Sequence, residues 1–217
     1  MKLQARGTAS GFDAPRLLRM RDNAANLRDS EALLCKSERL PESVNDSTIV
    51  APHVRQPPRY GLHPILCDVP DFDYLAEGDV VAVRPDGFAR VLYRRASPHN
   101  SIFVTDQCNS YCVMCSQPPK VINDRGRVAE ILELIDLIDP STTELGVTGG
   151  EPTLFGRDFL RIVQRAKDCL PKTALHVLTN GRLFYYRSFA RALADVGHPD
   201  LMLGIPLYSS VDWQHDL

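Results

Sequence analysis

The sequence contains no long hydrophobic run, no excess of basic residues and no signal-like start. No segment reaches the roughly 18 consecutive apolar residues that a membrane span requires. The first residues, Met-Lys-Leu-Gln-Ala-Arg-Gly, contain no apolar stretch of the kind found in secretion signals. The 217 residues carry a net charge of −2, so no basic surplus indicates a nucleic-acid or membrane-surface partner. We therefore expect a cytoplasmic protein without either kind of partner.

The chain also lacks a fourth cysteine beside its one cysteine cluster. Three of the six cysteines fall in a single short segment with CxxxCxxC spacing, as Cys108, Cys112 and Cys115. The other three are scattered singly at positions 35, 67 and 169. Clustered cysteines in a cytoplasmic chain indicate a metal rather than disulfides. We expect the isolated three to be small buried hydrophobic residues.

The missing ligand limits the kinds of metal site that the cluster can form. Four thiolates would close a tetrahedral zinc site or fill every iron of a [4Fe–4S] cluster, whereas three leave one iron open to a substrate or cofactor. A structural zinc site and a ferredoxin-type electron carrier are the alternatives, and both normally need a fourth ligand. The nearest histidine is His99, and no second CxxC or HxxxH pair accompanies the cluster. The spacing therefore favours a cluster with one open iron.

Strands and helices are expected to alternate from residue 101 onward. Apolar runs predict strands at 101–106, 143–148, 174–178 and 201–205, and helical periodicity predicts helices at 126–139, 157–170 and 183–196. Gly197 follows the third of these helices as its expected C′ residue. Such alternation builds a parallel sheet with right-handed crossovers.

Polar motifs follow each of the first three expected strands. They are the cysteine segment, Gly149-Gly150-Glu151-Pro152 and Thr179-Asn180-Gly181. Each of the latter two alone could be an ordinary turn. Ligands of parallel sheets bind outside the carboxyl ends of the strands, and all three motifs fall at that edge. The sequence thus predicts one site there. Arg182 and Lys120 near it could meet a carboxylate or phosphate or be solvated surface charges, and His176 is expected on the sheet.

Residues 1–100 are predicted to form a small β-containing module. A hairpin is expected from 80–83 and 88–93 around Pro85-Asp86-Gly87, and a short strand at 48–51. A helix is considered within 15–36, and prolines at 41, 52, 57 and 58 indicate loops around that strand. The module could be a lid, a peptide-docking edge or a cover for the end of the second domain.

The motifs together resemble the radical S-adenosylmethionine (SAM) superfamily. The flanks resemble more narrowly the C-type radical SAM maturase of the His-Xaa-Ser peptide system: Cys108-Asn109, Tyr111-Cys112, Met114-Cys115-Ser116-Gln117-Pro118-Pro119-Lys120 and the later Leu-Thr-Asn-Gly-Arg. The resemblance implies an α/β fold, the N-terminal part of a partial (β/α)6 barrel, over residues 101–217. It also implies that Cys108, Cys112 and Cys115 hold a [4Fe–4S] cluster whose fourth iron binds SAM.

The resemblance extends to contacts with SAM. Met114 stands where the family has a bulky apolar residue packing on adenine, although it could equally be a core methionine. Gly149, Gly150, Glu151 and Pro152 would grip the methionyl amine, because glycines permit close backbone approach and Glu151 offers a carboxylate. Asn180 would contact SAM or substrate. No side chain is assigned as catalytic.

The implied function is modification of a ribosomally made His-Xaa-Ser repeat peptide through SAM cleavage. The expected partners are that precursor peptide, an electron donor and a second radical SAM maturase. Radical chemistry on a nucleoside or small metabolite is an alternative, and so is a non-catalytic, cluster-binding half of a split maturase. The latter is motivated by the sequence ending after the fourth expected strand, where we expect a truncated or split gene product.

Overall fold

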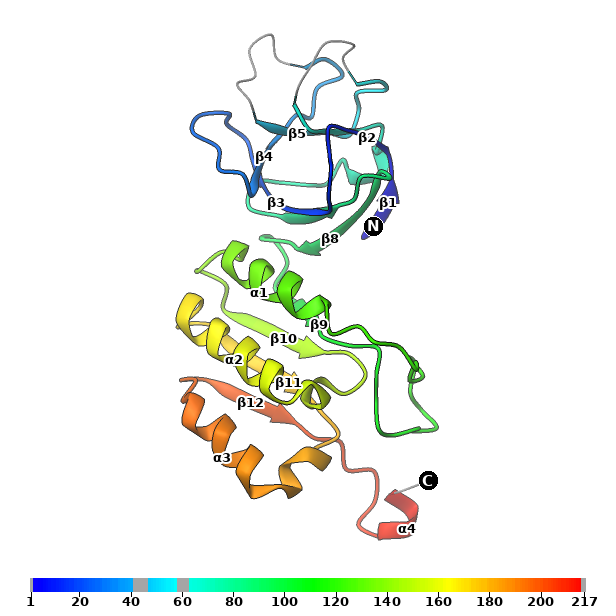
Figure 1. Cartoon of the computed structure of the whole chain (residues 1–217), viewed down its shortest axis with the longest axis vertical. Coiled ribbons are helices and arrows are strands. Elements are labelled where there is room, and N and C mark those ends of the chain that lie inside the picture. Colours follow the sequence, from blue (N-terminus) through cyan, green and yellow to red (C-terminus); the bar gives the residue numbers. More distant parts are fainter. Residues whose placement is uncertain (1, 41–46, 58–62, 216–217) are drawn as a thin grey trace. The chain divides into compact units, whose positions relative to one another are not determined.

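A computed structural model describes residues 2–40, 47–57 and 63–215 of the chain. Internal packing divides the chain into two compact units, residues 1–97 with 137–139 and residues 98–136 with 140–217. Each unit has its own sheet (Figure 1). The two are described separately below.

The first unit contains a sheet of eight strands. They are β1 Gln4–Arg6, β2 Thr8–Ser10, β3 Arg16–Arg21, β4 Glu31–Leu34, β5 Thr48–Ala51, β6 Ile65–Cys67, β7 Val80–Val83 and β8 Phe88–Tyr93. A short 3-10 helix, η1 (Pro70–Phe72), lies between β6 and β7. The strand order is β1-β8-β7-β3-β4-β5-β6-β2, and the side chains of Leu18, Met20, Leu66 and Phe72 are fully buried in its core.

The sheet is nearly closed into a barrel, because its two outermost strands are consecutive in the chain. β1 pairs with β8 and β2 pairs with β6, and only Gly7 separates β1 from β2. A Cβ on Gly7 would come within 2.2 Å of the Val69 side chain, so glycine is required where the two strands meet. This arrangement leaves the described strands without a long free edge of the kind that a docking peptide would extend.

The predicted hairpin and the predicted strand at 48–51 are confirmed as β7, β8 and β5. In the turn, the Gly87 N–H donates to the carbonyl of Arg84 at 3.0 Å, and Gly87 has a φ of 78°. The helix considered within 15–36 is wrong, because β3 and β4 occupy that segment. Leu17 and Leu18 are adjacent on β3 and face opposite sides of the sheet, yet both are buried, so the alternation typical of a strand with one exposed face is missing.

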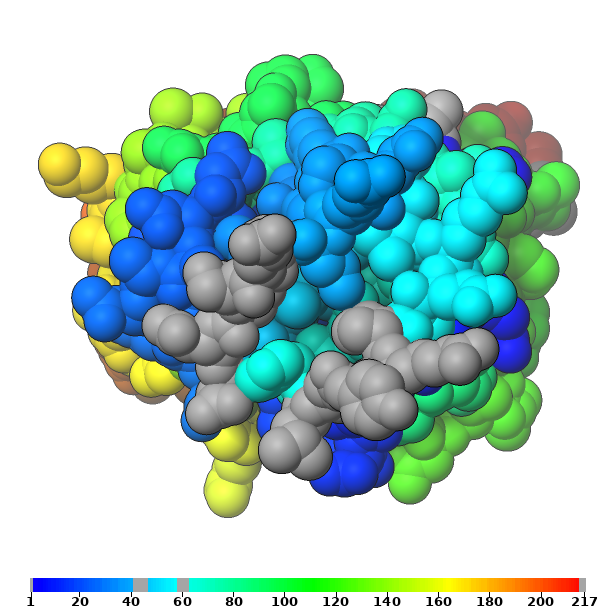
Figure 2. All heavy atoms as spheres, turned by 90° about the horizontal axis from the view of Figure 1, so that it is seen from above, coloured from blue at the N-terminus to red at the C-terminus, as the bar shows by residue number. Residues whose placement is uncertain are grey.

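Strands β3 to β6 run parallel to one another, and the described parts of their connections contain no helix. Side chains of these connections, blue and cyan in Figure 2, make up much of the face shown there. Pro41 and Pro58, where the sequence predicts loops, lie outside the described residues, whereas Pro52 and Pro57 lie in the irregular connection between β5 and β6.

The second unit contains a four-stranded parallel sheet with a helix after each of the first three strands. Its elements are β9 Asn100–Phe103, α1 Arg127–Leu137, β10 Glu144–Thr148, α2 Arg157–Cys169, β11 Ala174–Leu178, α3 Arg187–Val196, β12 Leu201–Gly204 and the short α4 Asp212–His215. Two 3-10 helices, η2 Pro152–Phe155 and η3 Arg182–Tyr185, precede α2 and α3. The strand order is β12-β11-β10-β9, so the predicted α/β fold is confirmed.

The three longer helices, α1, α2 and α3, lie along one face of this sheet (Figure 1). On β10 and β11 the buried positions alternate: Leu145, Val147, Leu175 and Val177 are buried, whereas their neighbours are more exposed. Helix α3 ends as expected at Gly197, whose φ of 63° and ψ of 42° are left-handed. No helix among the described residues is long and apolar enough to cross a membrane.

The register places the carboxyl ends of β9, β10 and β11 at one edge of the sheet. Thr148 lies opposite Phe103, and Val147 lies opposite Val177. The three polar motifs therefore share that edge, as the sequence predicts. The sequence ends with Asp216 and Leu217, which lie outside the described residues, as does the side chain of His215.

Candidate functional site

The cysteine loop, residues 107–126, leaves the carboxyl end of β9 and returns to the start of α1 without helix or strand. Cys108 is half-buried near its beginning, whereas Cys112 and Cys115 are exposed. The Cys115 N–H donates to the Cys112 carbonyl at 3.0 Å, which forms a tight turn between these two cysteines. All six cysteines are free, and Cys35 and Cys67 are buried as expected, whereas Cys169 is only half-buried.

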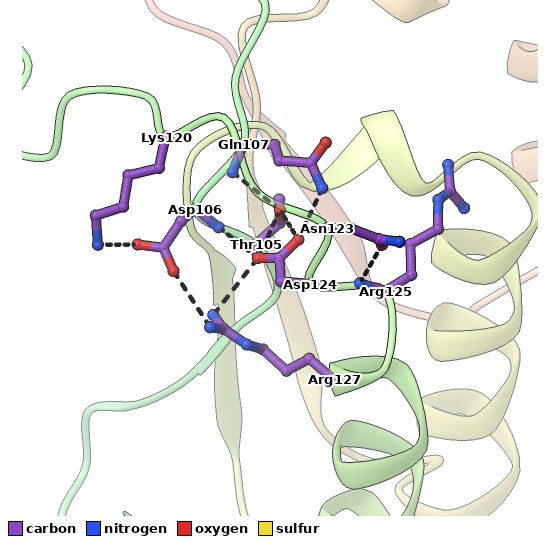
Figure 3. Close-up of polar contacts among 8 residues, drawn as sticks. All are labelled: Thr105, Asp106, Gln107, Lys120, Asn123, Asp124, Arg125 and Arg127. Carbon is purple, nitrogen blue, oxygen red and sulfur yellow. Dashed lines mark hydrogen bonds and ion pairs between the residues drawn. The ribbon is translucent and has the colours of Figure 1, made fainter.

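Asp124 closes the base of this loop by joining its two ends (Figure 3). Its carboxylate accepts hydrogen bonds from the Thr105 hydroxyl at 2.9 Å, the Asp106 N–H at 2.9 Å and the Gln107 side-chain amide at 2.7 Å. Burial raises the pKa of Asp124, but these hydrogen bonds favour the ionised form more strongly, so the pKa lies below its ordinary value. The carboxylate thus fixes the residues immediately before Cys108.

Asp106 provides a second connection across the loop base. It pairs with Lys120 at 2.8 Å and with Arg127 at 3.2 Å (Figure 3). The hydrogen bond from Lys120 is the main reason that the pKa of Asp106 is lowered; burial opposes it, and Arg127 adds to the lowering. Lys120, which the sequence leaves open as a ligand contact or a surface charge, lies in this ion pair.

Gly149 and Gly150 pack directly on the same loop base. The Gly150 N–H donates to the Thr105 carbonyl at 2.6 Å. A Cβ on Gly149 would lie 2.5 Å from the Thr105 carbonyl oxygen, and one on Gly150 would lie 2.1 Å from that of Gln107. Gly149 also has a φ of 141°. Both positions therefore require glycine for close contact with the loop backbone.

Glu151 is fully buried between the ends of β10 and β11. One carboxylate oxygen accepts from the Thr153 N–H at 3.0 Å, the Thr153 hydroxyl at 2.5 Å and the Thr179 hydroxyl at 2.7 Å. The other accepts from the Asn180 N–H at 2.6 Å. Pro152 follows as the first residue of η2 and is buried. The carboxylate thus joins two of the sheet-edge motifs.

Asn180 and Arg182 contact the first residues of the cysteine loop from the end of β11. The Asn180 side-chain amide donates to Asn109 Oδ1 at 2.7 Å, to the Ser110 hydroxyl at 3.2 Å and, at 3.9 Å, to the Cys108 sulfur. The Arg182 guanidinium donates to the Asn109 carbonyl at 3.0 Å. His176 lies half-buried on the sheet beside Glu144, with 3.1 Å between Nδ1 and a carboxylate oxygen.

A cavity of about 770 Å³ opens beside the loop. Loop residues 109–114 line it together with Asn180, Arg182, Pro206, Tyr208 and Gln214. Met114 is 69% exposed, so it is not a core methionine. The cavity lining contains one charged side chain, Arg182, together with side-chain amides and hydroxyl groups.

The three cysteines of this loop supply the thiolate donors that an iron–sulfur cluster requires. Among residues 2–40, 47–57 and 63–215, no three His, Cys, Asp or Glu side chains are grouped as one ion would require. Thiolates of a cluster bind different irons and need not converge on one point. Burial chiefly raises the pKa of Cys108; the Ser110 N–H opposes this, and the charges of Glu151, Cys112 and Cys115 add to it. Ionising all three thiols would place like charges close together, and a bound cationic metal would offset that repulsion.

The sequence analysis did not predict the contacts of the loop base or part of the cavity lining. The described contacts of Thr105, Asp106, Gln107, Asp124 and Arg127 depend on the chain returning to its starting point. An Asp shortly before a helix ordinarily indicates only a helix start. Tyr208 and Gln214 follow the last strand, where no motif signals a site.

Comparisons with known proteins agree with these observations. The model of the radical SAM superfamily matches residues 102–210. One solved structure, the crystal structure of selenomethionine BtrN in an open conformation, is 17% identical with a TM-score of 0.39. That match covers 57% of this chain and 56% of the BtrN chain, so this chain spans little more than half of BtrN. A search of curated proteins finds no match.

Proposed function

Because the chain belongs to the radical SAM superfamily, we propose that it uses SAM and a [4Fe–4S] cluster to modify a ribosomally made peptide with His-Xaa-Ser repeats. The observation that carries the chemistry is the match over residues 102–210, which contains the whole cysteine loop and the strand edge behind it. The three thiols, with no fourth cysteine in the loop, favour a cluster with one open iron.

In this proposal Cys108, Cys112 and Cys115 would hold the cluster, and SAM would bind at the iron left without a protein ligand. When bound, the pair supplies one-electron cleavage of SAM to a 5′-deoxyadenosyl radical, which can take hydrogen from an unactivated carbon. Met114 is exposed beside the cavity and offers an apolar surface to adenine. Gly149 and Gly150 hold the loop base, and the Pro152 turn follows them.

The peptide assignment has two supports. The first is the flanking sequence around the three cysteines and the Leu-Thr-Asn-Gly-Arg segment. The second is the cavity, whose lining includes polar side chains that a peptide backbone can hydrogen-bond, among them the amides of Asn109 and Gln214. Its volume falls within the roughly 300–1,000 Å³ range of ligand sites. Peptide substrate, electron donor and second maturase remain the proposed partners.

Anaerobic reconstitution tests the cofactor part. Iron and sulfide should give about four irons per chain, and dithionite with SAM should release 5′-deoxyadenosine. Cys112→Ser should abolish both, whereas Cys169→Ser, a half-buried cysteine at the end of α2, should leave both intact. Zinc in place of iron, or a folded chain that binds no cluster, would contradict the proposal.

A mass change in a peptide tests the substrate part. A His-Xaa-Ser repeat peptide should be modified only when SAM and reductant are present, and a peptide of the same composition in scrambled order should not. Release of 5′-deoxyadenosine that is equal with both peptides, without a change in mass, would favour a nucleoside or metabolite substrate. If modification appears only after the second maturase is added, the split-maturase form is supported.

A further inference from the structure

We propose that Glu151 is a positioning residue: through Asn180 it holds the start of the cysteine loop, so that Cys108 is in place before any cluster is bound. The inference rests on the proposed function only in taking this loop as the cluster-binding loop. It assigns Glu151 a task different from gripping the SAM amine, which is the role expected from the sequence.

The carboxylate of Glu151 is buried, and groups of the protein itself donate hydrogen bonds to both of its oxygens. It is 0% exposed and accepts four hydrogen bonds, from the Thr153 N–H and hydroxyl, the Thr179 hydroxyl and the Asn180 N–H. Three of these donors meet one carboxylate oxygen and one meets the other, so both oxygens are hydrogen-bonded within the protein. None of the four donors is a cation. A ligand ammonium would have to enter a site closed to solvent and meet the second oxygen beside the Asn180 N–H.

The same residue contacts both sides of the loop start. Its backbone N–H donates to the Gln107 carbonyl at 2.7 Å, next to Cys108 in sequence. Its side chain holds the Asn180 backbone, and the Asn180 side chain reaches Asn109, Ser110 and, at 3.9 Å, the Cys108 sulfur. A continuous chain of hydrogen bonds therefore runs from β10 through β11 to the first cysteine.

The burial of the three cysteines fits this arrangement. Cys108, which the chain of hydrogen bonds reaches, is half-buried, whereas Cys112 and Cys115 are exposed and contact neither Glu151 nor Asn180. Removing the Glu151 carboxylate should therefore affect Cys108 selectively. A general loss of stability in this unit would also expose Cys169, which is half-buried at the end of α2.

The test measures alkylation of each cysteine by iodoacetamide in the cluster-free full chain, followed by peptide mass spectrometry. Glu151→Gln preserves size but replaces one acceptor oxygen with an NH2 donor. That NH2 group must either face the Asn180 N–H, which is itself a donor, or take the place of the oxygen that accepts from Thr153 and Thr179. Asn180→Ala removes the next link. Each variant should raise the alkylation rate of Cys108 about tenfold, with half-buried Cys169 changing less than about twofold. The double variant should exceed the larger single effect by less than about twofold, because both act through one chain of contacts.

Thr173→Val is the matched control, because it removes a buried hydroxyl hydrogen bond, to the Thr142 carbonyl at 2.7 Å, at the opposite end of β11. It should lower Tm without a selective change at Cys108. If Glu151→Gln does not fold, Asn180→Ala alone decides the outcome. Unchanged alkylation of Cys108 in Asn180→Ala, or an equal rise at Cys108 and Cys169, overturns the proposal.

SAM affinity of the reconstituted protein separates the two roles of Glu151. With a positioning role, the Kd for SAM per bound cluster in Glu151→Gln should stay within about threefold of the parent value. A rise above about tenfold with unchanged Cys108 alkylation would identify a direct SAM contact and overturn the inference. Because alkylation is measured without cluster or peptide, a wrong substrate assignment leaves this readout unaffected.

Discussion

The need for glycine at positions 149 and 150 could arise from a bound ligand or from the backbone of the cysteine loop. Glycine at a strand end is expected to let a ligand approach the backbone. The neighbours in the structure are the carbonyl oxygens of Thr105 and Gln107, and Gly150 has no room for a methyl group beside Gln107. The glycines are therefore needed to hold the cysteine loop against β10, whatever they contact in addition.

Gly150→Ala should consequently disturb the loop base. The added Cβ would lie 2.1 Å from the Gln107 carbonyl oxygen, so the backbone must shift, at a cost of about 1–3 kcal/mol in the free energy of unfolding. The free energy of unfolding measured in urea and the iron content after reconstitution should both fall. Gly126→Ala is the control within the same loop, because no atom lies within 4 Å of its Cβ position, and it should change neither quantity. Equal effects in the two variants would refute this explanation.

The cysteine loop and the β7–β8 hairpin are both held in place by contacts with other segments of the chain. The loop 107–126 contains no helix or strand, yet Asp124 and Asp106 tie its two ends. The hairpin of β7 and β8 depends similarly on a contact outside itself, because the Gly7 N–H donates to the Gly87 carbonyl at 3.0 Å.

Gly87→Ala tests this closure. Gly87 has a φ of 78°, and a Cβ there would lie 2.0 Å from the Gly7 carbonyl oxygen. The left-handed backbone alone costs an alanine about 1–2 kcal/mol, and the clash adds to it. We expect a lower urea midpoint and faster hydrogen exchange in β1 and β8. Normal exchange in both strands would show that the turn tolerates the side chain.

The loop base should weaken in acid. Hydrogen bonds hold the pKa values of Asp106 and Asp124 below their ordinary value, although burial opposes this. A carboxyl group whose pKa is depressed in the folded state contributes stability above its unfolded pKa and loses that contribution as pH falls through the folded value. Asp124→Asn should therefore be less stable than the parent at pH 6, and the difference in urea unfolding should shrink below about pH 4. A difference independent of pH would contradict this linkage.

At the scale of the molecule, each unit has its own sheet and buried side chains. Leu18 is fully buried in the first unit, and Leu145 is 1% exposed in the second. Separate cores predict that damage to one remains local.

Leu18→Ala and Leu145→Ala form a matched pair for this prediction. Each removes the same buried atoms, at a cost of about 2–5 kcal/mol. Hydrogen exchange should accelerate in β3 and β7 for the first variant and in β9 to β11 for the second. If either variant accelerates exchange equally in both sheets, the units unfold as one.

The sequence anticipated the second unit far better than the first. Alternating strands and helices with regular apolar spacing predict β9 to β12 and α1 to α3 to within a few residues, because local periodicity determines such elements. In the first unit both sides of β3 are buried, and the described connections between its parallel strands contain no helix, so the pattern that distinguishes strand from helix is absent. The short strands β1, β2 and β6 consequently went unrecognised.

What the sequence determined by itself is the chemistry: three thiols at fixed spacing, and polar motifs after three successive strands. Strand direction then brings these motifs to one edge. Only the tertiary structure decided which groups touch, because Asp124 to Thr105, Glu151 to Asn180 and Asn180 to Cys108 are contacts between segments distant in the sequence. Such contacts follow from how a loop returns and how strands align, which no local pattern of residues records.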